Sequence, residues 1–259
     1  MNNSIPAVEK TLALLERLAA SDRGLTQLEF KEELGISMST CYRILQTLLA
    51  HEWVRKDEKG VYCPGKGLFP VLGAFRDSFF PWREISEILD RISRKQEIIC
   101  KLSIRQGADQ LTVLRSEPSG SENLPAFSGK RFSRFPVIEG SVGAVLLAQE
   151  SRENILLLAE NCPVDLQEKS SPQLIFRRIE FLRKHSYALN ENNRWHICAF
   201  SVPVRETSGG STAALTFILP RPGLDEKKRK KYVDLLMETG EKCEKTLNEK
   251  HHKGKGVLP

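Results

Sequence analysis

Four polar side chains in the segment 36–50 have the types and the spacing needed to contact a nucleic acid. The segment contains no Asp or Glu. Ser39, Arg43 and Gln46 share one side of a helix with the small Ala50, and Tyr42 lies at its margin. Hydroxyl, phenol, guanidinium and carboxamide groups hydrogen-bond to phosphates and to base edges. This pattern predicts a helix that reads DNA. An ordinary amphipathic helix with a solvated polar side is the alternative that the segment alone leaves open.

The opposite side of the same helix is apolar. Cys41, Leu45 and Leu48 recur at the spacing of a buried helical face. The hydroxyl of Ser37 can cap the first turn, so we expect the helix to begin at Met38.

Another helix is expected at the start of the chain. Its apolar face would consist of Val8, Leu12, Leu15 and either Leu18 or Ala19, with charged residues on the other sides.

A second helix is expected to follow Thr26. The threonine stands three residues before Glu29, which is the spacing of a capping box. Leu28 and Leu34 would form its apolar side, and Gly35 suits a left-handed residue that ends the helix.

A hairpin is expected after the third helix. Residues 53–56 and 61–63 are typical of short strands, and residues 57–60 of a turn. Three helices followed by a hairpin make a winged helix-turn-helix. Lys56 and Lys59 would lie where the wing contacts phosphates, and such contacts give affinity that depends on salt.

Together these segments resemble the IclR-type transcriptional regulators. The stretches AVEKTLALLERLA and LGISMSTCYRILQTLLAHEWVRKDEKGVYCPGKGL follow the family's first helix, recognition helix and exit. The positions in register are Ser39, Thr40, Arg43, Leu45, Thr47, Leu48, Tyr62, Gly65 and Leu68. The resemblance implies a regulator that binds double-stranded DNA, with contacts from Thr26, Ser37, Ser39, Thr40, Tyr42, Arg43, Gln46, Lys56 and Lys59.

Three residues depart from the family pattern. Lys31 replaces a small residue on the second helix, and Pro64 replaces a leucine in the exit. Pro70 stands where the family has a linker helix, and an interior proline breaks or kinks a helix.

The rest of the chain alternates expected helices and strands. Helices are expected over 83–96, 142–150, 152–161, 170–186 and 224–250, and strands over 98–105, 110–117, 197–206 and 212–220. Residues 118–134 are typical of a loop or weak strand. A mixed sheet with flanking helices is expected.

The predicted fold class is therefore α+β. We expect a winged helix-turn-helix domain over 5–66 and a flexible tail over 251–259. The resemblance to the IclR-type regulators implies a linker helix over 67–82 and a GAF-like effector-binding and oligomerisation domain over 83–250.

The second half also resembles the family. FPVIEGSVGAVLLA, RKHSYALNEN and AFSVPVRE with AALTFILP follow blocks of its effector domain. The resemblance implies a pocket for a small metabolite, such as an organic acid, lined by Ser141, Val142, Asn190, Ala199, Ser201 and Thr216. Backbone amides near Ser141 to Gly143, at a helix start, favour an anion.

Four pocket positions depart from the family. Ile138 replaces a histidine, Ala144 a lysine, Ala199 a cysteine and Asn190 an aspartate. These substitutions make the pocket less polar than that of the family. The pocket would then bind a different ligand or none. The alternative to effector binding is a structural role for these residues. Ser141 would then cap a helix, and Thr216 would form a hydrogen bond inside the sheet.

Charge does not locate the DNA-binding surface. The net charge is +6, yet residues 1–77 hold ten Lys or Arg and ten Asp or Glu. The cationic run 226–231 is typical of a nucleic-acid patch or of the solvated start of an amphipathic helix, and the apolar residues that follow favour the helix.

The sequence contains no pattern of an enzyme or a metal site. His196 with Cys198, and the adjacent His251 and His252, lack the four ligands of structural zinc. No cofactor is expected. Six scattered cysteines indicate reduced thiols. Because there is neither a signal peptide nor a run of about 18 apolar residues, we expect a cytoplasmic protein that does not contact a membrane.

One recognition helix contacts too few base pairs for selectivity. We therefore expect a homodimer that reads two half-sites, and the resemblance also implies a dimer of dimers. A bound metabolite would change the spacing of the paired helices. Two alternatives are a constitutive DNA-binding protein with a degenerate effector domain, and an enzyme or metabolite-binding protein that does not bind DNA.

Overall fold

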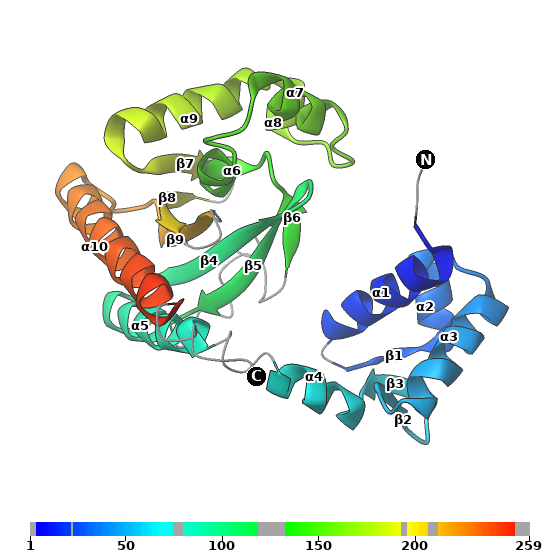
Figure 1. Cartoon of the computed structure of the whole chain (residues 1–259). Helices are drawn as coiled ribbons and strands as arrows, with labels where there is room; N and C mark the ends of the chain where they lie inside the picture. The colour runs from blue at the N-terminus through cyan, green and yellow to red at the C-terminus, as the bar shows by residue number, and fades with distance from the viewer. Residues whose placement is uncertain are drawn as a thin grey trace. The chain divides into compact units, whose positions relative to one another are not determined.

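The chain folds into two compact units in a computed structural model. The model describes residues 4–21, 23–74, 80–118, 133–192, 196–206 and 212–251. One unit spans Met1–Phe79 and the other Phe80–Pro259 (Figure 1). Residues 75–79 of the expected linker and 252–259 of the expected tail lie outside the described residues.

The N-terminal unit has the predicted order of three helices and a hairpin. Its elements are α1 (Pro6–Ala19), β1 (Leu25–Thr26), α2 (Gln27–Leu34), α3 (Met38–Ala50), β2 (Val54–Lys56), β3 (Val61–Pro64), the 3-10 helix η1 (Lys66–Leu68) and α4 (Phe69–Ala74). Antiparallel pairing gives a sheet of order β1-β3-β2. The sequence did not predict β1, which is only two residues long.

Side-chain hydrogen bonds cap the starts of α2 and α3, and a glycine ends α2, as predicted. The hydroxyl of Thr26 accepts from the Glu29 amide, and the Glu29 carboxylate accepts from the Thr26 amide, which completes the capping box of α2. Gly35 ends that helix at φ 63°. The hydroxyl of Ser37 accepts from the Thr40 amide and caps α3.

Thr26→Ala is expected to destabilise α2 by about 1 kcal/mol, because an amide of the first turn loses its acceptor. Amide hydrogen exchange along α2 in the full chain should then be several times faster. Thr47→Ala is the control, because the Thr47 hydroxyl only donates back to the Arg43 carbonyl within α3. Equal effects of both substitutions would show that the cap contributes nothing.

The core of the N-terminal unit confirms one predicted helical face and corrects two. Cys41, Leu45 and Leu48 of α3 are buried, as predicted. The buried side chains of α1 are Leu14 and Leu18.

The predicted apolar face of α1 is only half correct: Leu18 is buried and Leu15 packs against the core, whereas the first part of the face lies at the surface. Val8 is 50% exposed and Leu12 is 54% exposed. Helix α1 thus has a second apolar stripe, which the packing of this unit leaves uncovered. On α2 the prediction is also wrong for Leu28, which is 49% exposed, because Phe30 fills the core in its place.

Pro70 does not interrupt a helix. It lies in the first turn of α4, directly after η1. The amides of a first turn have no partner within the helix, so proline is tolerated there. Pro81 has a similar place near the start of α5.

The C-terminal unit is a six-stranded sheet with helices on both faces. Its elements are α5 (Phe80–Gln96), β4 (Ile99–Gln106), β5 (Asp109–Ser116), β6 (Arg134–Pro136), α6 (Gly140–Leu146), α7 (Arg152–Glu160), α8 (Gln167–Ser170), α9 (Gln173–His185), β7 (Ala188–Asn192), β8 (Ile197–Arg205), β9 (Thr212–Pro220) and α10 (Glu226–His251). The predicted helices and strands are present, whereas α8 and β7 were not predicted, and β6 begins at the last residue of the segment expected to be a loop or weak strand.

The strand order is β6-β5-β4-β9-β8-β7, and each of the five pairings is antiparallel. The prediction of a mixed sheet is therefore wrong. Short connections join β4 to β5 and β7 to β8, and neighbouring strands joined in this way must run in opposite directions.

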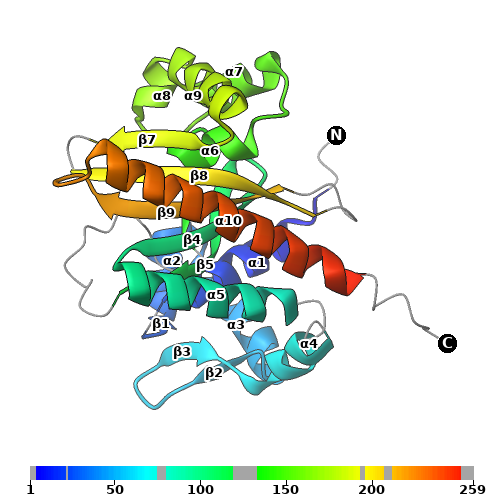
Figure 2. The same ribbon diagram turned by 90° about the vertical axis from the view of Figure 1, so that its left-hand side faces the viewer.

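The two faces of the sheet have separate apolar cores. Helices α5 and α10 lie side by side over one face, where Leu102, Phe200 and Phe217 are buried (Figure 2). Helices α6, α7 and α9 pack over the other face around Val145 and Ile179 (Figure 1). None of the described helices is long and apolar enough to cross a membrane.

Candidate functional sites

The polar side chains that the sequence predicted on one side of α3 are exposed to solvent. Ser39, Tyr42, Arg43 and Gln46 are all exposed, and Tyr42 is 52% exposed. The buried residues Cys41 and Leu45 hold the opposite side against α1, α2 and the small sheet. The polar row is thus free to approach a groove of DNA.

Three hydroxyls gather at the start of α3. The Ser37 hydroxyl lies 2.8 Å from that of Thr40 and 3.1 Å from that of Ser39. All three groups belong to the first turn of a 13-residue helix, whose positive dipole end attracts phosphate. Their contact with DNA remains a prediction.

Thr26 has a structural role that limits any contact with DNA. Its hydroxyl donates to Oε2 of Glu29 at 2.9 Å, and a hydroxyl has only one proton to donate. Hydrogen bonds from Arg23 and from Thr26 lower the pKa of Glu29 to about 2, so the acceptor stays charged at neutral pH. A phosphate would have to displace this bond.

The wing is held by its own turn. Oδ1 of Asp57 accepts from the amides of Lys59 and Val61, at 2.9 and 2.8 Å. Lys56 and Lys59 are exposed, and Nζ of Lys56 lies 5.3 Å from the ring centroid of Tyr62. The contact of both ammonium groups with phosphates remains a prediction.

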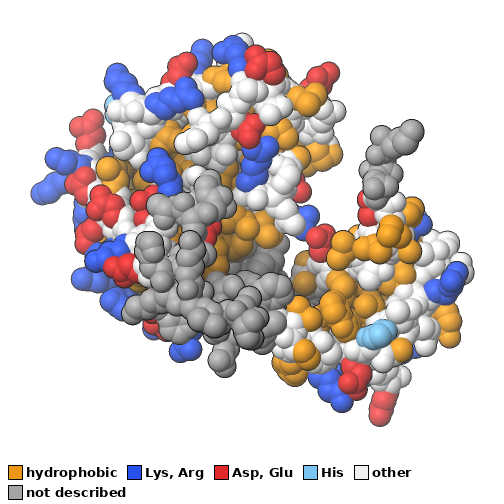
Figure 3. Space-filling view, in the orientation of Figure 1, with side chains coloured by type: hydrophobic (Ala, Val, Ile, Leu, Met, Phe, Trp, Pro, Cys, Tyr) orange, Lys and Arg blue, Asp and Glu red, His pale blue; other side chains and the backbone are white. Residues whose placement is uncertain are grey.

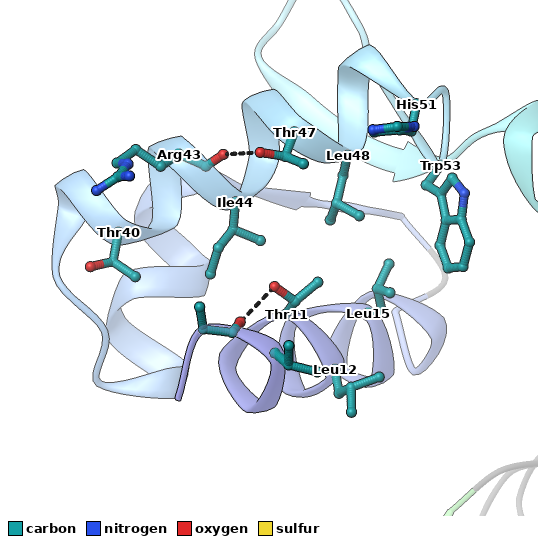
Figure 4. A pocket seen from close by; sticks show the side chains of 12 residues that line it. Thr11, Leu12, Leu15, Thr40, Arg43, Ile44, Thr47, Leu48, His51 and Trp53 are labelled. Carbon is teal, nitrogen blue, oxygen red and sulfur yellow. Dashed lines mark hydrogen bonds between the residues drawn. The ribbon is translucent and has the colours of Figure 1, made fainter. Parts of the chain in front are cut away.

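An open groove of about 690 Å³ lies between α1 and α3. Ile44 and Leu48 of α3 face Thr11 and Leu15 of α1 across it, and Arg43 stands at its edge (Figure 4). Hydrophobic side chains also gather over α1 in the space-filling view (Figure 3). The exposed stripe of α1 forms one wall of this groove.

The C-terminal unit holds a smaller cavity, of about 70 Å³, between the sheet and the start of α6. It brings together five of the six predicted effector residues: Ser141, Val142, Asn190, Ala199 and Thr216. The sixth, Ser201, is fully buried beneath them. Its hydroxyl donates to that of Ser141 and is hydrogen-bonded to that of Thr216, both at 2.8 Å.

Ser141 does not cap α6. Glu139 is the N-cap residue, and Ser141 lies within the helix with its side chain turned to the sheet. The prediction that Ser141 caps a helix is thus wrong. The prediction that Thr216 forms a hydrogen bond inside the sheet is confirmed, because its hydroxyl is bonded to that of Ser201.

The start of α6 already holds an anion from the same chain. Oε1 of Glu168 accepts from the Gly140 amide at 3.2 Å, and the Gly143 amide donates to the Glu139 carbonyl at 3.1 Å. A carboxylate from α8 thus takes the first donor of the helix, and the helix itself takes the Gly143 amide. The predicted preference of the Ser141 and Val142 amides for a ligand anion remains a prediction.

Arg178 of α9 holds that carboxylate in place. Its guanidinium forms an ion pair with Glu168 and donates to Oδ1 of Asn190 at 3.0 Å. The side chain of Glu168 is only 8% exposed. Asn190, where the family has aspartate, thus contacts a cation through its amide oxygen.

Sequence reasoning missed seven residues that line the cavity: Lys101, Gln110, Phe135, Glu139, Gly140, Ile197 and Ile218. Lys101 is 6% exposed, and its Nζ lies 5.7 Å from the ring centroid of Phe135. Gln110 donates to the carbonyls of Pro136 and Glu139, which shapes the turn before α6.

The signal for Lys101 was present in the sequence. In the strand ICKLSIR, Lys101 and Ser103 alternate with Cys100, Leu102 and Ile104, so one face is polar and the other apolar. A lysine inside a strand that is otherwise apolar is unusual enough to mark a site.

The start of α10 is solvated, as the helix interpretation expected. Lys227 and Lys230 are exposed, and Arg229 pairs with Glu191 of β7. The acidic neighbour of this cationic turn thus belongs to the same chain.

A nucleophilic cysteine and a metal site each have requirements that can be compared with the described residues. Burial raises the pKa of Cys198 to about 11, so its thiol is a poor nucleophile at neutral pH. All six cysteines are free. Within the described residues, no three His, Cys, Asp or Glu side chains cluster in the manner of a metal site. His252 lies outside those residues.

Comparison with known proteins gives consistent matches over both units. Residues 7–58 match a family described as IclR helix-turn-helix domain, and residues 82–245 match one described as Bacterial transcriptional regulator IclR C-terminal. A probable HTH-type transcriptional regulator ArcR of Halobacterium salinarum is 23% identical over 208 residues, which cover 78% of each chain.

Solved structures share the fold. An IclR transcriptional regulator from Alicyclobacillus acidocaldarius has a TM-score of 0.76 at 21% identity, over 95% of this chain and 100% of that one. An IclR homologue from Microbacterium hydrocarbonoxydans, complexed with 4-hydroxybenzoate, has a TM-score of 0.73 at 18% identity, over 93% of this chain and 98% of that one.

The C-terminal match alone spans more than half of the 259 residues, and the N-terminal match covers nearly all of the three helices and the first strand of the wing. The chain belongs to the IclR family of transcriptional regulators, with a helix-turn-helix DNA-binding domain followed by an effector domain.

Proposed function

We propose that this cytoplasmic regulator inserts α3 into the major groove of an operator as a dimer or dimer of dimers, and that a small organic acid in the C-terminal unit modulates DNA binding. The observation that carries the proposal is the exposed polar row of α3 above a fully buried apolar row. The proposed function includes no enzymatic activity.

Each of the predicted DNA-binding residues has a part in docking. Arg43 contacts a phosphate or a guanine, and Gln46 and Tyr42 reach base edges. The DNA backbone is held by the remaining predicted residues: Ser37, Ser39, Thr40, Lys56 and Lys59, and Thr26 where a phosphate displaces its bond to Glu29. Backbone contacts fix the register on the duplex, whereas base contacts select the sequence.

A second copy is needed for selectivity. One recognition helix reads only a few base pairs, and two copies that read half-sites one turn apart double that number. The exposed apolar stripe with Val8 and Leu12 supports an interface between copies on α1. Sedimentation of Leu12→Glu, compared with the wild type, tests this interface.

Substitution of the wing lysines is expected to weaken binding evenly across DNA sequences. Each of Lys56→Ala and Lys59→Ala should lower the slope of log affinity against log salt by about 1 for each copy bound, because one phosphate contact is lost. Fluorescence anisotropy with DNA from upstream of the protein's own gene, at several salt concentrations, measures this slope. Lys184→Ala, at an exposed site on α9, is the control. An unchanged slope would exclude the wing from the interface.

The effector part of the proposal has its own test. Organic acids should change the affinity for DNA and also stabilise the chain against heat. The small volume of the cavity, about 70 Å³, favours a second candidate, a constitutive DNA-binding protein with a degenerate effector domain. Intact DNA binding without stabilisation by any acid would support that candidate.

A further inference from the structure

A second cavity of the C-terminal unit lies on the face of the large sheet that α5 and α10 cover (Figure 2). It measures about 320 Å³. The apolar side chains that line this α5–α10 cavity are Trp82 of α5, Ile104 of β4, Val204 of β8, Ala213 of β9 and Leu247 of α10. Among the described residues, it shares no lining residue with the cavity beside α6. The two cavities are therefore separate sites.

The α5–α10 cavity exists because a short side chain stands where the sheet otherwise has long ones. Val204 lies directly opposite Ala213 on the neighbouring strand, so these two side chains share a face. The next residues of β9 on this face are Leu215 and Phe217, and both fill the core under the two helices. The methyl group of Ala213 does not reach as far, and a space remains above it.

Helix α10 is fastened to the sheet beside this space. Oε1 of Glu244 accepts from the Arg205 amide at 2.8 Å, and Nδ2 of Asn248 donates to the Arg205 carbonyl at 3.0 Å. The two bonds flank Leu247 in the sequence, so the helix cannot move down to close the space without breaking them. Apolar walls that face a void lose dispersion contacts. A ligand that fills the space would restore these contacts.

The size and the walls of the α5–α10 cavity suit a small molecule. Pockets for such ligands typically measure about 300–1,000 Å³, are mostly apolar and hold a few polar groups that orient the ligand. This cavity, at about 320 Å³, lies at the lower end of that range, and most of its lining side chains are apolar. A ligand with one aromatic ring or a short aliphatic chain would fit.

The charges of the lining favour a cation. Arg105 and Glu206 are the charged residues among the described lining. The guanidinium of Arg105 forms an ion pair with Glu150, and its Nε donates to the Gly107 carbonyl at 2.9 Å. Its charge is thus balanced within the chain, whereas Glu206 adds a carboxylate to the wall. The indole of Trp82 also attracts a cation that lies over its face, within about 6 Å of the ring centre.

We propose that the α5–α10 cavity binds a small primary amine with an aromatic or short aliphatic body. Its ammonium group pairs with Glu206 and lies beside Trp82, and its apolar body fills the space between Val204, Ala213 and Leu247. This site goes beyond the proposed effector function, because the face of the sheet, the residues and the charge of the ligand are all different. It stands or fails independently of any organic acid.

The test compares 2-phenylethylammonium chloride with 2-phenylethanol plus sodium chloride, because the two probes have the same body and only one is charged. At pH 7 a primary amine is protonated, as the lysine side chain is. The full-length wild type, Glu206→Gln and the control Glu241→Gln, at an exposed site on α10, are titrated by calorimetry. The wild type and the control should bind the ammonium about tenfold more tightly than the alcohol, as a charged hydrogen bond would give.

Glu206→Gln should remove this difference by weakening the ammonium alone. A second variant places the ligand beside the indole. Trp82→Leu keeps an apolar wall but removes the aromatic ring, so it should weaken the ammonium about two- to fivefold more than the alcohol. Melting temperatures measured without ligand check that each variant is folded.

The preference for the charged probe distinguishes this cavity from the others. The groove between α1 and α3 holds Arg43 and His51, and no carboxylate is among its described lining residues. The cavity beside α6 holds Lys101 together with Glu139. Neither of them favours a cation as the α5–α10 cavity does.

Several results would overturn the proposal. These are no binding of either probe to the wild type, equal affinity for the two, and a preference for the ammonium that survives in Glu206→Gln. Equal losses of ammonium affinity in Glu206→Gln and Glu241→Gln would also overturn it, because they would reflect the overall charge of the chain. Equal weakening of both probes by Trp82→Leu would exclude the indole from contact with the ammonium group.

Discussion

Arg43→Ala is expected to lower the affinity for operator DNA by about 1–3 kcal/mol for each bound copy, and so by up to twice that for a dimer. The side chain is exposed on α3, and no described carboxylate pairs with it. Its five N–H donors are therefore available to a phosphate or a guanine, which is the commonest partner of arginine in a major groove. Fluorescence anisotropy with DNA from upstream of the protein's own gene measures the loss.

Arg43→Lys separates charge from geometry. Lysine keeps the positive charge but lacks the planar fork that binds two acceptors together. If Arg43 contacts a guanine, Arg43→Lys should retain binding to unrelated DNA and lose preference for the operator. If Arg43 contacts only a phosphate, both DNAs should bind Arg43→Lys nearly as well as the wild type. Full operator affinity in Arg43→Ala would refute the docking of α3.

Arg178→Met is expected to destabilise the C-terminal unit by about 3–5 kcal/mol. The substitution leaves the carboxylate of Glu168 buried with the Gly140 amide as its remaining donor and without its cation. A buried charge that loses its partner costs more than the pair contributed, because its desolvation is no longer compensated. Urea unfolding of the full-length chain, followed by tryptophan fluorescence and circular dichroism, measures the change.

Arg177→Met is the matched control, because Arg177 is the neighbouring residue on α9 and is exposed. It should change stability by less than about 0.5 kcal/mol. Adding Glu168→Gln to Arg178→Met should recover part of the loss, because the buried charge is then gone. If Arg177→Met and Arg178→Met cost the same, the buried ion pair does not stabilise the start of α6.

Features that depend on a few neighbouring residues were readable from the sequence. The capping box of Thr26 and Glu29, the cap of Ser37 and the left-handed Gly35 each involve residues at most four positions apart. Backbone donors at a helix start can be satisfied by such near neighbours, whatever the rest of the chain does. The order of elements in the winged helix-turn-helix follows from these local signals and from apolar periodicity.

Periodicity alone was not enough where a helix has two apolar sides. On α3 one side is polar, and its buried face was predicted correctly. On α1 both Leu14 with Leu18 and Val8 with Leu12 have helical spacing. The packing of α1 against α2 and β3 buries the first pair, and nothing local distinguishes it from the second.

Only the tertiary structure decided the chemistry of the cavity beside α6. Lys101 meets Thr216 because β9 pairs with β4, and Glu168 reaches Gly140 because α8 packs beside α6. These partners are far apart in the sequence, and a strand register shifted by one residue would turn every side chain to the other face. The sequence by itself determined the helices, their caps and the residues offered to DNA, whereas the pairing of distant strands decided which charges are buried together.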